Sequence, residues 1–187
     1  MVNYFELMGL PIDFNLDKNQ LDITFRTLQI QYHPDIANNS ANQTSTSQNL
    51  PSLANLSNEQ ASAVINTAYH TLKNSDSRAT HLLELINQAD GLQDSIRDLD
   101  FLDNAMDLRI SLDEADMTAL PSLKAKLQDW ITQVEQNFYQ AYQTQNWQTA
   151  KTATQQLKFL IKLQHDFAKK TDELVNQAHD NDDDLYV

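Results

Sequence analysis

Residues 21–35 read LDITFRTLQIQYHPD, an amphipathic segment that ends in the tripeptide His33-Pro34-Asp35. Its apolar residues recur four, three and four positions apart, which places them on one side of a helix; they are Leu21, Phe25, Leu28 and Tyr32. Because proline disfavours helical backbone at the residue before it, the helix should stop at or before His33. A second stripe with the same spacing follows at Ala61, Ile65, Ala68 and Leu72. Two such helices joined as a hairpin can bury each other, which leaves the polar loop between them free to meet a partner.

Turn and capping signals divide the first part of the chain into four expected helices, at 4–10, 18–32, 58–73 and 77–89. Asp17 carries a side chain typical of an N-cap, and Ser57 with Gln60 forms the pattern of a capping box. Residues 37–58 carry no charge and are dominated by Asn, Ser, Gln and Thr. We therefore expect them to form a long flexible or disordered insert.

The sequence of the second part of the chain predicts three helices, at 96–115, 117–144 and 147–178. Pro121 is tolerable only in the first turn of the middle helix. The two longer helices meet at a tight turn near Gln145-Asn146 and should form an antiparallel pair. Their expected core stripes are Leu123, Leu127, Trp130, Val134, Phe138 and Ala141, and Leu157, Leu160, Ile161, Gln164, Phe167 and Ala168.

These segments predict an all-α protein with an N-terminal helical hairpin and a C-terminal three-helix bundle. The expected parts are a first domain at 1–76, a connecting helix and linker at 77–95, a second domain at 96–179 and an acidic tail at 180–187.

Composition limits the classes of function. The net charge of −13 disfavours binding to nucleic acid or to an anionic membrane surface. The chain has no cysteine, no His spacing typical of a metal site and no phosphate-binding glycine loop. The first ten residues lack the features of a signal peptide, so we expect a cytoplasmic protein. We expect no cofactor, no metal and no enzymatic activity.

The helix expected at 96–115 carries more apolar surface than one packed side needs. Its core stripe, spread over about 60° of arc, is Phe101, Ala105, Leu108 and Leu112. A second stripe, about 135° away, consists of Leu99, Leu102, Met106 and Ile110. Asp103 and Asp107 border it.

On the last helix, Phe159 and Leu163 also project about 100–140° from the expected core stripe. An apolar patch with a charged rim is typical of a partner-binding site. Burial of the stripe at 99–110 against the helix at 77–89 is the alternative. For the tripeptide, a plain helix stop is the alternative to a functional loop.

Several motifs resemble the J-domain family. They are Tyr4-Phe5-Glu6-Leu7-Met8-Gly9-Leu10, Gln31-Tyr32-His33-Pro34-Asp35 and Ile65-Asn66-Thr67-Ala68-Tyr69. Arg78-Ala79-Thr80-His81-Leu82-Leu83, Asp100-Phe101-Leu102, Leu108-Arg109, Leu157-Lys158-Phe159-Leu160 and Lys162-Leu163 follow in the order found in one subgroup. In these motifs the chain is similar to the HscB family, the J-domain co-chaperones of iron–sulfur cluster assembly.

The resemblance implies that the tripeptide, with Arg26 on the helix before it, docks on an HscA/DnaK-type chaperone and stimulates its ATPase. It also implies that the second domain binds an IscU-type scaffold protein, with apolar contacts on Leu102, Met106 and Phe159. These three residues belong to the surplus patch found by counting helix angles. The expected scaffold-binding set is Leu99, Leu102, Asp103, Met106, Asp107, Ile110, Phe159 and Leu163.

The sequence departs from the family pattern in places. The helix before the tripeptide has only Lys18 and Arg26 as basic residues, so electrostatic steering toward a chaperone should be weak. On the second domain, Asp103 stands where an apolar residue is frequent, and Ile110 where an acid is. Two alternatives stay open: a J-protein with a different client, and a helical interaction scaffold without chaperone coupling.

Overall fold

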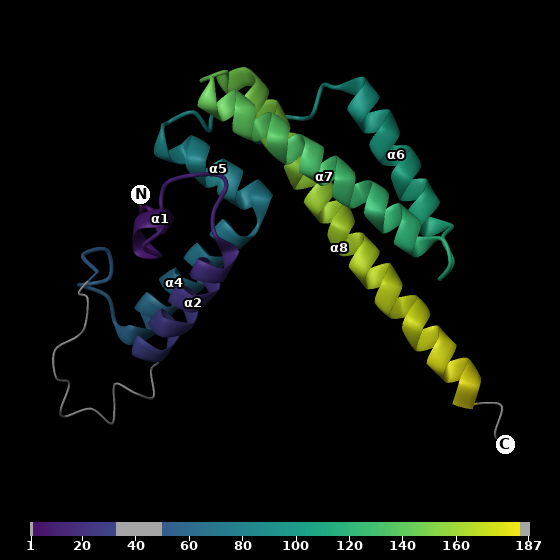
Figure 1. The fold of residues 1–187 in the computed structure, drawn as a ribbon, viewed down its shortest axis with the longest axis horizontal. Helices are drawn as coiled ribbons and strands as arrows, with labels where there is room; N and C mark the ends of the chain where they lie inside the picture. Colours follow the sequence, from purple (N-terminus) through teal and green to yellow (C-terminus); the bar gives the residue numbers. More distant parts are fainter. Residues whose placement is uncertain (1, 33–49, 184–187) are drawn as a thin grey trace. The chain divides into compact units, whose positions relative to one another are not determined.

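The computed structural model describes residues 2–32 and 50–183, with side chains up to residue 176. Over these residues it contains seven helices and no strand, which confirms the all-α prediction (Figure 1). The helices are α1 (Tyr4–Leu7), α2 (Lys18–Gln31), α4 (Asn58–Lys73), α5 (Ser75–Leu85), α6 (Leu99–Asp113), α7 (Leu120–Gln143) and α8 (Trp147–Asp183). The chain divides into two compact units, Met1–Gln88 and Ala89–Val187. The first unit includes α5, which covers part of the segment expected to connect the domains.

The first unit is built on the antiparallel pair α2 and α4, which lie side by side in Figure 1. Their register is fixed by two side-chain hydrogen bonds: Tyr69 Oη donates to Asp22 at 2.8 Å, and Gln29 Nε2 donates to Asn66 Oδ1 at 2.7 Å. Phe25 stacks on Tyr69 with ring centroids 3.9 Å apart. The two predicted stripes meet in the core, where the buried members are Leu21, Leu28, Ala61, Ile65, Ala68 and Leu72.

The capping predictions for this unit are confirmed. Asp17 accepts hydrogen bonds from the backbone N–H groups of Asn19 and Gln20 at the start of α2. Ser57 and Gln60 form both bonds of a capping box at the start of α4. These bonds satisfy N–H groups that have no partner within a helix.

The prediction of a flexible insert at 37–58 is wrong for the last part of this segment. The stretch from residue 50 to 56 forms hydrogen-bonded turns, and Leu53 is only 2% exposed. Its apolar side chain is buried, so this stretch belongs to the packed unit in spite of its polar composition.

In the second unit, α7 and α8 form the predicted antiparallel pair, and α6 packs along both. The turn between α7 and α8 is made by Gln145 in a left-handed conformation, with φ of 57°. The N–H of Asn146 then bonds the carbonyl of Ala141 at 2.8 Å, which closes the end of α7. Pro121 lies in the first turn of α7, as predicted.

Helix α8 buries more of its circumference than predicted because it packs against two helices. Its buried residues are Ala150, Ala153, Thr154, Leu157, Leu160, Leu163 and Phe167. These span about 180° of arc. Ile161 and Gln164 are only half-buried and Ala168 is exposed, so placing these three in the core stripe was wrong.

Candidate partner-binding surfaces

The tripeptide His33-Pro34-Asp35 lies outside the described residues. Helix α2 ends at Gln31 with Tyr32 as its C-cap, so the helix stops before His33 as the sequence predicts. Arg26 is exposed on α2. It stands two turns before the tripeptide, on the helix that leads into it.

The outward side of α2 also carries two isoleucines that sequence reasoning did not assign to a site. Ile23 is 59% exposed and Ile30 is 67% exposed. They are seven positions apart and lie opposite the buried Leu21 and Leu28, with Arg26 between them along the helix. Counting helix angles on α2, as was done for residues 96–115, would have found them. We call Ile23, Arg26 and Ile30 the α2 face.

The surplus stripe on α6 is exposed over most of its length. Leu99, Met106 and Ile110 are 72%, 61% and 49% exposed. Asp103 and Asp107 are exposed beside them, as predicted. The alternative, burial against the helix at 77–89, involves the other unit and stays open. We call Leu99, Leu102, Asp103, Met106, Asp107 and Ile110 the α6 face.

Leu102 and Phe159 are half-buried, at the edge of the α6 face where α6 meets α8. Phe159 contacts the ring of Phe101 edge-on, with centroids 5.9 Å apart. The structure thus brings Phe159 of α8 next to α6, although 57 positions separate it from Leu102. The part of each side chain that remains exposed can extend the α6 face toward α8.

Contacts along this seam show that α6 and α8 run parallel. Gln156 Nε2 donates to Asp98 Oδ2 at 3.1 Å near one end, and Lys170 Nζ donates to the carbonyl of Asp113 at 3.1 Å near the other. Between them, Arg109 pairs with Asp166 at 3.6 Å. Residue numbers therefore increase in the same direction along both helices.

Leu163 was predicted to be part of the exposed patch, and this prediction is wrong. Its side chain is 2% exposed. It stands on α8 between Phe159 and Asp166, two of the positions that contact α6. The prediction took α8 to have one packed side, whereas the seam with α6 adds a second.

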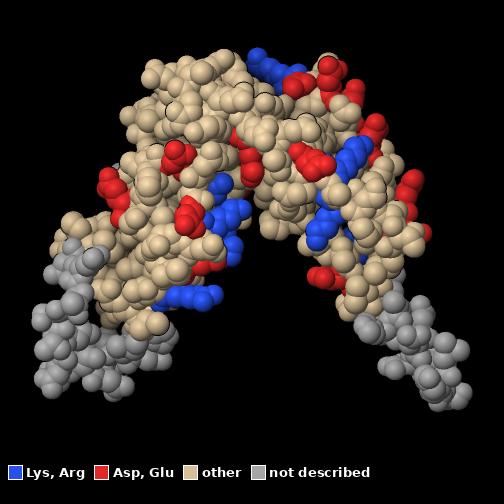
Figure 2. Space-filling view, viewed as in Figure 1, with Lys and Arg blue, Asp and Glu red and all other residues tan. Residues whose placement is uncertain are grey.

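The charge along α6 is mainly negative. Figure 2 shows carboxylates along the outer edge of this helix. Its acids are Asp100, Asp103, Asp107 and Asp113. Its one basic residue, Arg109, is held in the ion pair with Asp166. The α6 face therefore combines apolar side chains with an acidic rim, which fits an apolar partner surface with basic residues at its edge.

Other kinds of site find little support in the described part of the chain. There, no three His, Asp or Glu side chains converge as metal ligands. No helix within the same ranges is long and apolar enough to span a bilayer.

The chain is similar to known proteins over nearly all its length. A family model described as the HSCB C-terminal oligomerisation domain matches residues 97–168. A co-chaperone protein HscB homolog from Acinetobacter baumannii (strain SDF) is 34% identical over 190 residues, covering 98% of this chain and 100% of the relative. The homolog from Vibrio cholerae (strain M66-2) is 34% identical over 180 residues, covering 93% and 99%.

Solved structures agree. The chaperone HscB from Vibrio cholerae matches with a TM-score of 0.70 and 31% identity, over 92% of this chain and 99% of that one. The human co-chaperone HscB matches in fold, with a TM-score of 0.67 and 22% identity, over 91% and 82%.

The sequence and structure matches thus place this all-α, two-unit chain among the co-chaperones. It belongs to the HscB family.

Proposed function

We propose that this chain stimulates the ATPase of an HscA/DnaK-type chaperone and delivers to it an IscU-type scaffold protein for iron–sulfur cluster assembly or transfer. The observation that carries the proposal is the α6 face. Its large apolar side chains, led by Leu99 and Met106, are exposed although the core of the second unit is complete without them. Family membership supports the same assignment.

The α6 face suits a protein partner on energetic grounds. Burial of a large apolar side chain contributes about 1.5–3 kcal/mol, so Met106, Ile110 and Leu99 together can anchor a complex. Leu102 and Phe159 add a partly sheltered edge, where anchors lose water most completely on binding. Asp103 and Asp107 then favour partners with basic groups at the rim and set orientation more than affinity.

The first unit is proposed to couple this binding to the chaperone through the tripeptide and the α2 face. The proposed action of the tripeptide is to bind one conformation of the chaperone and increase that conformation's population. The first unit has only four Lys and Arg residues, and one of them, Arg78, is buried. Ile23 and Ile30 are therefore proposed to supply much of the contact.

A scaffold held on the second unit is tethered to the same chain as the chaperone-binding loop. Tethering raises the effective concentration of the scaffold at the chaperone without any new contact. This explains how one small helical protein can present a client and trigger ATP hydrolysis together.

Steady-state ATPase of an HscA-like chaperone tests both halves of the proposal. We expect this protein to stimulate hydrolysis, and an IscU-type scaffold to increase the stimulation further. Stimulation that ignores the scaffold would leave a J-protein with another client. An absence of stimulation would overturn the chaperone half and leave a helical interaction scaffold.

A further inference from the structure

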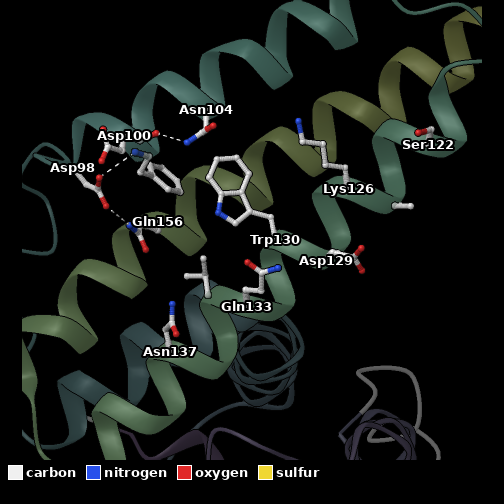
Figure 3. A pocket seen from close by; sticks show the side chains of 13 residues that line it. Asp98, Asp100, Asn104, Ser122, Lys126, Asp129, Trp130, Gln133, Asn137 and Gln156 are labelled. Atoms are coloured by element: carbon white, nitrogen blue, oxygen red, sulfur yellow. Dashed lines mark hydrogen bonds between the residues drawn. The ribbon is translucent and has the colours of Figure 1, made fainter.

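A groove of about 830 Å³ runs between α6 and α7 in the second unit. Figure 3 shows the indole of Trp130 standing in the space between the two helices. Trp130 is half-buried, and its ring contacts the buried Phe101 with centroids 5.0 Å apart. Val134, also buried, adds apolar surface to the lining. The size and the aromatic wall are typical of a site that accepts a side chain from a ligand.

The groove is distinct from the α6 face. Asp100 and Asn104, which line it from α6, project about 100–140° around the helix axis from Leu99. The groove opens toward α7, whereas Leu102 and Phe159 lie at the seam with α8. A ligand in the groove therefore uses a different side of α6 from the scaffold partner proposed above.

The charged lining is mainly acidic, with Asp98, Asp100 and Asp129 against Lys126. The Asp98 carboxylate already has structural partners: it caps α6 by accepting a hydrogen bond from the N–H of Phe101, and it accepts another from Gln156. Asp100 and Asp129 are exposed, and neither side chain makes a hydrogen bond or ion pair within residues 2–32 and 50–176. Their carboxylates are available to a cationic ligand.

Polar groups for a peptide backbone are also present. Gln133 and Asn137 line the groove from α7, one turn apart. Within the described part of the chain, neither amide side chain has a hydrogen-bond partner, and in Figure 3 both lie along the groove below Trp130. An amide can donate and accept at once, so this pair suits the alternating N–H and C=O groups of an extended peptide.

We propose that this groove binds an arginine- or lysine-containing peptide segment of a partner protein. The cationic head group lies over the Trp130 indole, which is the aromatic side chain that attracts cations most strongly. Asp100 and Asp129 supply the opposite charge. The aliphatic stem of the basic residue packs against the apolar surface around Trp130.

Charge complementarity favours this occupant over a second copy of the chain. The chain carries 26 acidic and 13 basic residues, so two copies repel each other. Nucleic acid meets the same repulsion from the groove carboxylates. Lys126 gives the site a direction, because it repels a cation from the end of the groove near Ser122.

The test uses the full chain with Trp147→Phe, so that Trp130 gives the only indole N–H signal in an NMR spectrum. The probe is the peptide acetyl-Leu-Arg-Leu-Arg-amide, compared with matched peptides that carry Gln or Glu in place of Arg. We expect a saturable shift of the Trp130 signal with the Arg peptide alone. Asp100→Asn with Asp129→Asn should weaken binding by about tenfold or more, since two charge-assisted contacts are lost.

The control is Asp113→Asn with Asp172→Asn, which changes the net charge equally but lies outside both the groove lining and the α6 face. It should leave the affinity within about twofold. The proposal is overturned if no peptide gives a saturable shift, if the Gln or Glu peptide binds as well, or if both double variants weaken binding equally. A shift that depends on protein concentration alone would assign the groove to a second copy and overturn it too.

Discussion

The imidazole Nε2 of His81 accepts a hydrogen bond from the backbone N–H of Tyr4 at 3.1 Å, which joins α5 to α1 across 77 positions of the chain. The two rings also stack, with centroids 4.4 Å apart. Because Nε2 is the acceptor, the bound form of His81 is the neutral ring with its proton on Nδ1. Glu84 lies 3.7 Å from that nitrogen. The histidine of the subgroup motif thus holds the first helix of the unit in place.

This bond predicts that the first unit loses stability in mild acid. Burial lowers the pKa of His81 below its ordinary value of 6.5, and the nearby Glu84 opposes the shift only in part. His81 therefore binds a proton more readily in the unfolded chain than in the folded one, and the free energy of unfolding falls as the pH drops below about 6.5. We expect a lower thermal unfolding temperature at about pH 5.5 than at about pH 7.

His81→Phe keeps an aromatic ring against Tyr4 but removes the acceptor. We expect it to lower the unfolding temperature at neutral pH. It should also remove most of the change in unfolding temperature between about pH 5.5 and about pH 7. The exposed His165, replaced by Gln, is the control and should leave the dependence intact. An unchanged pH dependence in His81→Phe would show that another group titrates.

Arg78, from the same motif, predicts a second effect on stability. Its guanidinium donates to the carbonyls of Leu72 and Lys73 at the end of α4 and lies 4.7 Å from the centroid of the Phe14 ring. Arg78→Met retains the apolar stem but leaves the buried carbonyl of Leu72 and the partly buried one of Lys73 without this donor, which should cost about 1–3 kcal/mol in the free energy of unfolding. Urea denaturation measures the loss. Arg97→Met, at an exposed position, should change stability by less than about 0.5 kcal/mol.

These two residues show what the sequence could and could not reveal. Helix spacing predicts the core residues of α2 and α4 well, because their buried side chains form clean apolar stripes. On α7 it predicts most of the core, but Leu123 and Trp130 are only half-buried. His81 bonds a residue 77 positions away, and Arg78 contacts the distant Phe14 ring as well as two carbonyls five and six positions before it. A count of helix spacing encodes none of these contacts. The same reason explains Leu163. Its burial comes from the seam with α6, and helix angles counted on α8 alone do not show that a second helix packs there.

The candidate site was predicted more fully on α6 than on α2. Leu99, Met106 and Ile110 were found because their stripe exceeds what one packed side requires. Ile23 and Ile30 carry the same signal, but they were not counted. The groove at Trp130 was out of reach, because Trp130 fits the core stripe of α7 and only the position of α6 leaves its indole half-exposed.

The tripeptide is expected to be needed for chaperone stimulation alone. His33→Gln should abolish the increase in chaperone ATPase and leave binding of an IscU-type scaffold unchanged, because the two partners are proposed to bind different units. ATPase assays and calorimetric titration with the scaffold provide the two measurements. Normal stimulation by the variant would reduce the tripeptide to a helix stop.

The α2 face predicts that stimulation depends on apolar contact more than on charge. Ile23→Ser with Ile30→Ser should raise the concentration of protein needed for half-maximal stimulation by about tenfold or more, the loss expected from two buried anchors. Neither isoleucine is needed for the fold, as both are well exposed. Thr27→Ser, on the same exposed side, is the control.

Salt distinguishes the two kinds of contact on α2. Raising it from about 0.05 M to about 0.3 M screens exposed charges and should change half-maximal stimulation by less than about threefold. A steep loss of stimulation with salt would instead assign the docking to Arg26 and Lys18, and would contradict the apolar interpretation.

The α6 face gives the last prediction. Replacing Leu102, Met106 and Phe159 together by Ala should weaken binding of an IscU-type scaffold by about 2 kcal/mol or more, or about 30-fold in Kd, as loss of interface anchors does. Phe159 also contacts Phe101, so the triple variant should unfold at a somewhat lower temperature. Met106→Ala with Leu99→Ala separates the effects, because both side chains are mainly exposed and should affect binding without affecting stability. Normal binding by both variants, with only the triple variant destabilised, would mean that these side chains support the fold and that the scaffold binds elsewhere.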